Sequence, residues 1–385
     1  MHRRRVHYFS GFDPRGPAHY HRLFREQAER PQPGGGHLSV SPRHRAGTHI
    51  HRWQVDWQPD PDADDPGSPV RTEHVFMGWD DLIRRHWSRS PLALAREFVR
   101  VHAAMLGHVG LGRVRRLYPN AFLTAILPAG WLGASLLLGA LAAVGAHAWL
   151  AAPLAAALGA GVVAGLGALG AHAGLFWLLR IYHFILCMAQ DRVAGLDSRA
   201  HDWVEDIIRR QQDDPVDEVV LAGHSVGTLV MIDAVDRLLA DPRWQALQRG
   251  RRTGMLTLGQ CYPCLTLLPG AAAFRQALQR LSRHPDLRWL DVTALIDPMC
   301  FYRTPPLAGT PEAADCGPQP VQLAARFFHM YEPRRWARIR RDKLQAHFLY
   351  LMTPDRAGNF DLFAMLYGPQ PFEQQLVAAR LAAAR

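Results

Sequence analysis

Apolar and polar residues are distributed along this chain in a way that predicts strands and helices following one another at both ends of the sequence. After residue 197, short apolar runs and amphipathic stretches take turns, as in EVVLAG at 218–223 followed by GTLVMIDAVDRLLA at 227–240. This alternation indicates an α/β fold, in which helices cover both faces of a mostly parallel sheet. The expected strands lie at 5–12, 52–57, 218–223, 254–259, 287–295 and 321–328. The expected helices lie at 22–30, 80–87, 91–106, 198–212, 227–240 and 272–283.

The middle of the chain replaces this alternation with a long apolar segment. Residues 117–179 contain no Lys, Arg, Asp or Glu. Two stretches within it, 121–146 and 154–179, each exceed the about 20 residues that cross the apolar core of a bilayer, and the uncharged HAWLAAP between them predicts a tight turn. Gly and Ala are frequent in both stretches and would let two helices approach closely. Gly161 and Gly165 form a G-x-x-x-G pattern, which is a weak signal in a stretch so rich in glycine. We therefore expect a transmembrane helical hairpin rather than a buried hairpin of a soluble protein.

Arginines on both sides of this hairpin predict its orientation. Arg113, Arg115 and Arg116 precede the first stretch, Arg180 and Arg192 follow the second, and the tip carries no charge. By the positive-inside rule, both flanking parts of the chain are cytoplasmic. We expect an integral protein of the cell (inner) membrane with two spans.

The soluble parts are expected to form one α/β domain that the hairpin interrupts, because neither part has enough strands to build a sheet alone. Residues 1–116 supply its N-terminal part with amphipathic connecting helices, 117–186 the hairpin, and 187–385 its C-terminal part. The hairpin follows the strand at 52–57. Since the chain leaves each strand of a parallel sheet at the carboxyl edge, where ligands bind, the hairpin should leave from that edge.

Composition and charge narrow the choice of partners. The formal net charge is +10, and Lys343 is the only lysine. This balance suits a surface near anionic lipid headgroups, and no zinc-finger or RNA-recognition motif supports nucleic-acid binding. The five cysteines have no regular spacing, and the C-x-x-C of Cys261 and Cys264 lacks the two further ligands that a zinc site needs. We expect membrane lipids, and no nucleic acid and no metal, as partners.

The sequence GHSVG between the strand at 218–223 and the helix at 227–240 points to a nucleophilic serine. A serine on a sharp strand-to-helix turn projects its Oγ above the sheet, at a helix N-terminus whose dipole and free N–H groups face the reacting centre. Gly223 and Gly227, two residues before and after Ser225, would let the strand and the helix come close. A plain glycine-rich turn is the alternative, and the flanking elements favour the nucleophile.

In this motif and its flanking strand and helix, the chain resembles the α/β-hydrolase fold family of serine hydrolases. His224, directly before the serine, resembles the variant found in many lipases and esterases. The resemblance covers most of the chain outside 117–179. It implies a catalytic triad in the chain order serine, acid, histidine, with no metal or cofactor.

Two acids and two histidines fit that order. Asp297 follows the strand at 287–295 and would lie at its carboxyl edge, whereas Asp291 lies within the strand pattern, so we favour Asp297 as the acid. Among the histidines further along the chain, His347 stands in HFLYL, which resembles the His-x-x-Tyr arrangement of several lipase-like hydrolases. His329 follows the possible last strand and remains an alternative, and we favour His347 as the base.

The resemblance also implies an oxyanion hole. One donor would be the N–H of Val226, and the second an N–H of Gly11 or Phe12 in the loop after the first strand, where the His-Gly-Gly-Gly of many esterases is missing. We therefore expect a membrane-anchored hydrolase of carboxylic esters or thioesters, whose acyl substrate is a small molecule or lipid-like. An acyltransferase with the same triad, and a catalytically silent membrane scaffold, are the alternatives.

Overall fold

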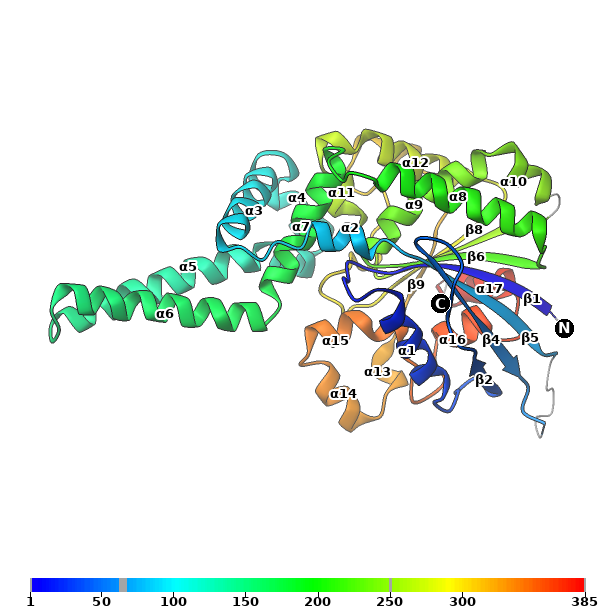
Figure 1. The fold of residues 1–385 in the computed structure, drawn as a ribbon, viewed down its shortest axis with the longest axis horizontal. Helices are drawn as coiled ribbons and strands as arrows, with labels where there is room; N and C mark the ends of the chain where they lie inside the picture. The colour runs from blue at the N-terminus through cyan, green and yellow to red at the C-terminus, as the bar shows by residue number, and fades with distance from the viewer. Residues whose placement is uncertain (1, 62–67, 249–250, 384–385) are drawn as a thin grey trace.

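A mixed, mostly parallel nine-stranded sheet forms the centre of the computed structural model, which describes residues 2–61, 68–248 and 251–383 (Figure 1). Its order is β2-β4-β5-β1-β6-β7-β8-β9, with β3 pairing to β4. β1 and β5–β9 run parallel, whereas β4 is antiparallel to β2, β3 and β5. The strands are β1 (His2–Phe9), β2 (His37–Val40), β3 (His44–Arg45), β4 (Ile50–Gln58), β5 (Val70–Met77), β6 (Glu218–His224), β7 (Thr253–Leu258), β8 (Leu287–Thr293) and β9 (Val321–Ala324).

Helices cover both faces of the sheet, as the alternating pattern predicts. α8, α9 and α12 lie on one face and α1, α13 and α14 on the other (Figure 1). The apolar run of β6 is continuous because Val219 and Leu221 pack into the first core while Val220 and Ala222 pack into the second. The helices of the soluble part are α1 (Gly16–Ala28), α2 (Asp80–Arg85), α3 (Pro91–Ala104), α4 (Leu111–Leu117), α8 (Leu196–Asp213), α9 (Val226–Ala240), α10 (Pro242–Leu247), α11 (Tyr262–Thr266), α12 (Ala272–Arg283), α13 (Phe327–Met330), α14 (Pro333–Ile339), α15 (Lys343–Phe348), α16 (Leu362–Tyr367) and α17 (Phe372–Ala383).

The uncharged segment forms a helical hairpin that projects from the domain (Figure 1). Its helices, α5 (Pro119–His147) and α6 (Ala152–His172), are long and apolar enough to cross a membrane. α5 matches the first apolar stretch to within two residues, whereas α6 ends seven residues before residue 179, where the apolar pattern ends. Gly174 adopts a left-handed conformation there, and a third helix, α7 (Leu175–Ala189), begins after it. α7 packs against the domain and runs past residue 186, where the hairpin was expected to end.

The hairpin helices approach each other at a different pair of glycines from the predicted one. A Cβ on Gly159 would lie 2.6 Å from the carbonyl oxygen of Gly139, so neither position has room for a side chain. Gly161 and Gly165 face open space, with no atom within 4 Å of an added Cβ. The expected close approach through small residues is therefore confirmed, but it uses Gly139 on α5 and Gly159 on α6 and not the G-x-x-x-G pattern.

The chain leaves the sheet for the hairpin after β5, a strand that the sequence pattern does not reveal. The predicted exit after the strand at 52–57 is wrong, because that strand is β4, which is antiparallel and ends at the opposite edge. β5 is parallel to β1, and β1 is parallel to β6. Parallel strands end at one edge, so the hairpin still leaves from the edge at which β6 ends at His224, directly before Ser225.

Candidate active site

Ser225 occupies a strained turn between β6 and α9. Its backbone has φ 55° and ψ −128°, a conformation that costs a residue with a Cβ about 1–3 kcal/mol. A Cβ on Gly227 would lie 2.3 Å from the carbonyl oxygen of Phe9, and one on Gly223 would lie 3.1 Å from the amide nitrogen of Thr228. The two glycines therefore allow the close approach of strand and helix that the motif predicts.

The structure brings the favoured acid and histidine together. Oδ2 of Asp297, in the loop after β8, lies 2.9 Å from Nδ1 of His347 in α15. Asp297 is 0 % exposed and His347 1 %. The carboxylate also accepts hydrogen bonds from the amide of Met299 at 2.9 Å and the hydroxyl of Tyr350 at 3.1 Å. Burial by itself raises the pKa of Asp297, but the adjacent His347 and the hydrogen bond from the amide of Met299 hold it below its ordinary value, so the carboxylate is ionised.

The alternative acid and histidine lie in other surroundings. Asp291 accepts a hydrogen bond from the hydroxyl of Thr257 at 2.7 Å, and burial raises its pKa to about 7. His329 is exposed on α13, where its ring lies 3.8 Å from that of Phe328. Among the four candidates, only Asp297 and His347 form a buried acid–imidazole pair.

His224 connects the serine turn to the helix that carries the imidazole. Its Nε2 donates to the carbonyl oxygen of His347 at 3.0 Å, and the two rings lie 4.8 Å apart. Burial, together with the nearby His347, lowers the pKa of His224 to about 3, so this histidine is neutral and keeps the N–H that makes the bond. The motif suggested His224 as a family variant, and its role as a tie to α15 could not be read from the sequence.

Ser225 and His347 are thus held on two connected segments. Because Nδ1 of His347 faces Asp297, Nε2 is the nitrogen that is left to accept a proton from the Ser225 hydroxyl. Among the described residues, no hydrogen bond joins the Ser225 hydroxyl to this imidazole. In free enzymes such contacts are often long and tighten when substrate binds. Ser225 is 7 % exposed, so a substrate must enter past neighbouring side chains.

The loop after β1 lies directly against the serine. A Cβ on Gly11 would lie 3.3 Å from Cβ of Ser225, so the backbone of this residue borders the reacting centre. Val226 is the first residue of α9, and its N–H has no partner within the helix. The carbonyl of Phe12 accepts a hydrogen bond from Nε1 of Trp177 at 3.0 Å, which fixes the loop to α7. Of the three expected oxyanion residues, Gly11 and Val226 therefore lie next to Ser225, and Phe12 follows Gly11 in the same loop.

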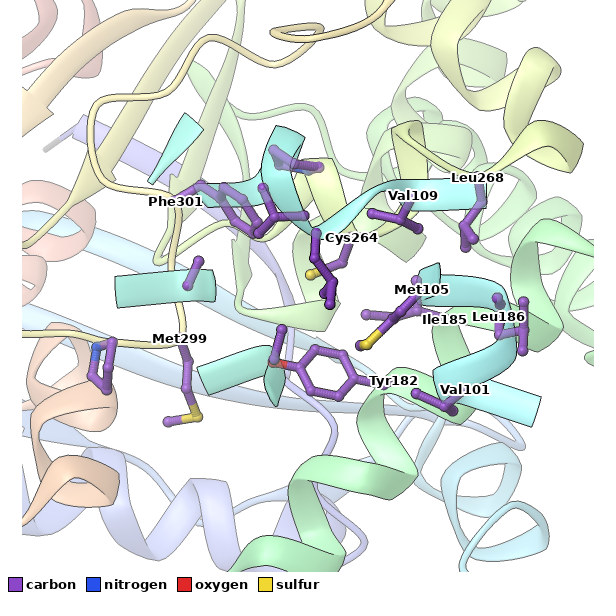
Figure 2. Close-up of a pocket in the computed structure, with 17 residues that line it drawn as sticks. Val101, Met105, Val109, Tyr182, Ile185, Leu186, Cys264, Leu268, Met299 and Phe301 are labelled. Atoms are coloured by element: carbon purple, nitrogen blue, oxygen red, sulfur yellow. The ribbon is translucent and has the colours of Figure 1, made fainter. Parts of the chain in front are cut away.

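Two apolar cavities lie beside the loop that follows Asp297. The first, which we term the hairpin-base cavity, has a volume of about 230 Å³. The second, the narrow cavity, has a volume of about 50 Å³ and is drawn in Figure 2. Pro298 and Met299 line both of them. The hairpin-base cavity is lined by Leu123, Leu127, Trp177, Leu178, Met299 and Leu344, among others. The narrow cavity is lined by Val101, Met105, Tyr182, Ile185, Met299 and Phe301, among others.

In the part of the chain that the structure describes, no three His, Cys, Asp or Glu side chains gather as a metal site would require. Cys261 and Cys264 are free thiols.

Comparison of the chain with protein-family models, with curated proteins and with solved structures finds no match. The function is therefore argued from the geometry around Ser225.

Proposed function

We propose that the protein is a membrane-anchored serine hydrolase of the α/β-hydrolase fold, which cleaves carboxylic esters or thioesters. The observation that carries this proposal is the buried pair of Asp297 and His347, tied by His224 to a serine in a strained strand-to-helix turn. The three residues follow in the chain order that the fold requires, on the carboxyl edge of the parallel strands. A structural role alone does not require this backbone conformation at Ser225.

The reaction would proceed through an acyl-enzyme. Oγ of Ser225 attacks the carbonyl carbon while Nε2 of His347 accepts the hydroxyl proton, and the oxyanion receives hydrogen bonds from the N–H of Val226 and of Gly11 or Phe12. The C–O or C–S bond then breaks, and the imidazolium returns the proton to the leaving alcohol or thiol. Water, deprotonated by the same nitrogen, cleaves the acyl–serine bond and restores the enzyme. Asp297 holds the imidazole tautomer and stabilises its charged form.

The membrane anchor would be the hairpin of α5 and α6, with both flanks in the cytoplasm. The length and apolar surface of the two helices support this, as do the flanking arginines. Because the hairpin leaves from the edge of the sheet that carries Ser225, the catalytic edge would face the inner leaflet. The exposed side chains of Leu92 on α3 and of Leu106 in the helical turn after α3 suit that interface.

A serine-directed fluorophosphonate probe tests the proposal on the full chain in detergent or nanodiscs. We expect labelling of the native protein, none of Ser225→Ala, and a loss of about 10²-fold or more in rate for His347→Ala. His329→Ala is the matched control and should label at the native rate, because this histidine is exposed and lies on α13. Absence of labelling in folded native protein would favour the silent scaffold.

A further inference from the structure

The hairpin-base cavity is built jointly by the hairpin and by the segments that carry the candidate triad. Leu123 and Leu127 come from α5, and Trp177 and Leu178 from α7. The opposite wall is supplied by Pro298 and Met299, which directly follow Asp297, and by the first residues of α15, which carries His347. The hydroxyl of Thr124 donates to the carbonyl of Pro298 at 2.8 Å and holds the two walls together. The cavity thus connects the membrane hairpin to the catalytic residues.

Trp177 is shared by this cavity and the surroundings of the candidate triad. Its ring lines the cavity on one side, and its centroid lies 6.4 Å from that of His347. Its Nε1 donates to the carbonyl of Phe12, in the loop that borders Ser225. The indole is therefore in contact with the cavity, with the imidazole of the candidate triad and with the loop that borders Ser225.

We propose that the hairpin-base cavity binds the linear hydrocarbon chain of a lipid ester or thioester that enters from the bilayer, with Trp177 as the barrier in front of Ser225. The inference rests on the proposed function and names its substrate class. An apolar cavity of about 150 Å³ holds the six carbons of benzene, so about 230 Å³ holds about nine carbons. Met299 lines both cavities, and joining the narrow cavity of about 50 Å³ to the first would add room for about two carbons more.

Chain-length profiles test this assignment. The full chain in nanodiscs is assayed with p-nitrophenyl esters of two to sixteen carbons, and with acetates of alcohols of the same lengths, so that acyl and alcohol chains are compared. In one of the two series, kcat/KM should rise about fourfold per methylene up to about nine carbons and then level off or fall. A flat profile in both series overturns the inference.

Two substitutions move the cavity wall in opposite directions. Leu127→Trp fills the cavity and should shift the optimum to shorter chains, whereas Met299→Ala joins the two cavities and should shift it by at least two carbons to longer chains. Leu141→Trp is the matched control, since Leu141 is 59 % exposed on the same helix and lines neither cavity. An optimum that moves equally in Leu141→Trp, or that stays fixed in Met299→Ala, overturns the inference.

The two proposals fail in distinguishable ways. If acetate hydrolysis by the native protein persists in Ser225→Ala, the proposed function fails and the substrate class fails with it. If hydrolysis depends on Ser225 but no variant changes the chain-length profile, the proposed hydrolase function stands and only the chain-binding role of the cavity is overturned.

The substitution Trp177→Phe tests the barrier. It keeps a ring but loses the bond to Phe12, and it should raise the rate of fluorophosphonate labelling. An unchanged or lower rate contradicts the barrier.

Discussion

Replacing Ser225, the proposed nucleophile, by glycine should give a more stable protein than replacing it by alanine. The native backbone at this position, φ 55° and ψ −128°, costs a residue with a Cβ about 1–3 kcal/mol, and glycine adopts it without that penalty. Glycine loses more conformational entropy on folding, about 0.5–1 kcal/mol relative to alanine. The difference leaves Ser225→Gly more stable than Ser225→Ala by up to about 2 kcal/mol.

The comparison of glycine with alanine isolates the backbone, because both variants lack the hydroxyl. Both are purified in the same detergent, and their unfolding midpoints are compared by differential scanning fluorimetry. About 1 kcal/mol corresponds to a shift of about 2–4 °C for a domain of 150–250 residues. At a relaxed position the order is reversed, because glycine is then the less stable variant. A lower midpoint for Ser225→Gly than for Ser225→Ala would refute the argument that the turn is strained.

Three further outcomes follow from the contacts described. Asp297→Asn should fold but lower kcat for p-nitrophenyl esters by about 10⁴-fold, since the amide favours the wrong tautomer of the imidazole; a loss below tenfold would contradict its role. Burial lowers the pKa of His74 to about 3. Below pH 6.5 the His74 side chain therefore binds a proton in the unfolded chain but stays neutral in the folded protein. Stability should therefore fall with decreasing pH between about 6.5 and 3, by up to about 1.4 kcal/mol per unit, and His74→Gln should reduce that slope in denaturant titrations at pH 5 to 7. Gly227→Ala should destabilise by about 3 kcal/mol or more, because the methyl group would lie 2.3 Å from the carbonyl oxygen of Phe9, while Gly161→Ala, in open space, should leave the midpoint nearly unchanged.

Local patterns in the sequence were sufficient to predict the elements around the candidate serine. The helix expected at 272–283 is α12 to the residue, and the strand expected at 218–223 is β6 with one residue added. In both cases the decisive interactions are short-range: an amphipathic period in the helix, and in the strand an apolar run followed by glycine. Asp297 was preferred because it follows its strand, and the structure places it against His347.

The strand β5 could not be predicted, because its polar residues find their partners far away in the chain. His74 is fully buried, stacks on Trp53 of β4 with ring centroids 4.3 Å apart, and lies 2.8 Å from the hydroxyl of Tyr367. In sequence, RTEH reads as a polar segment, and only the tertiary contacts show that it is interior. The direction of β4 was missed for the same reason, since pairing to the unpredicted β5 fixes it. The tie from His224 to His347 likewise joins residues that no local pattern connects.

The position of β1 in the sheet has a consequence for the order of assembly. β1 lies between β5 and β6, and β6 follows the hairpin in the chain, so a growing polypeptide exposes the unpaired edge of β1 until the hairpin has been made. The base of the hairpin then holds the acid's loop, through the bonds from Tyr118 to Leu295 and from Thr124 to Pro298. If the hairpin resides in the bilayer, a chain that fails to integrate would expose the unpaired edge of β1, which can aggregate. The loop that carries Asp297 would also lack its contacts with the hairpin. Membrane integration would then have to precede the activity proposed for Ser225, so that a copy outside the membrane remains inactive.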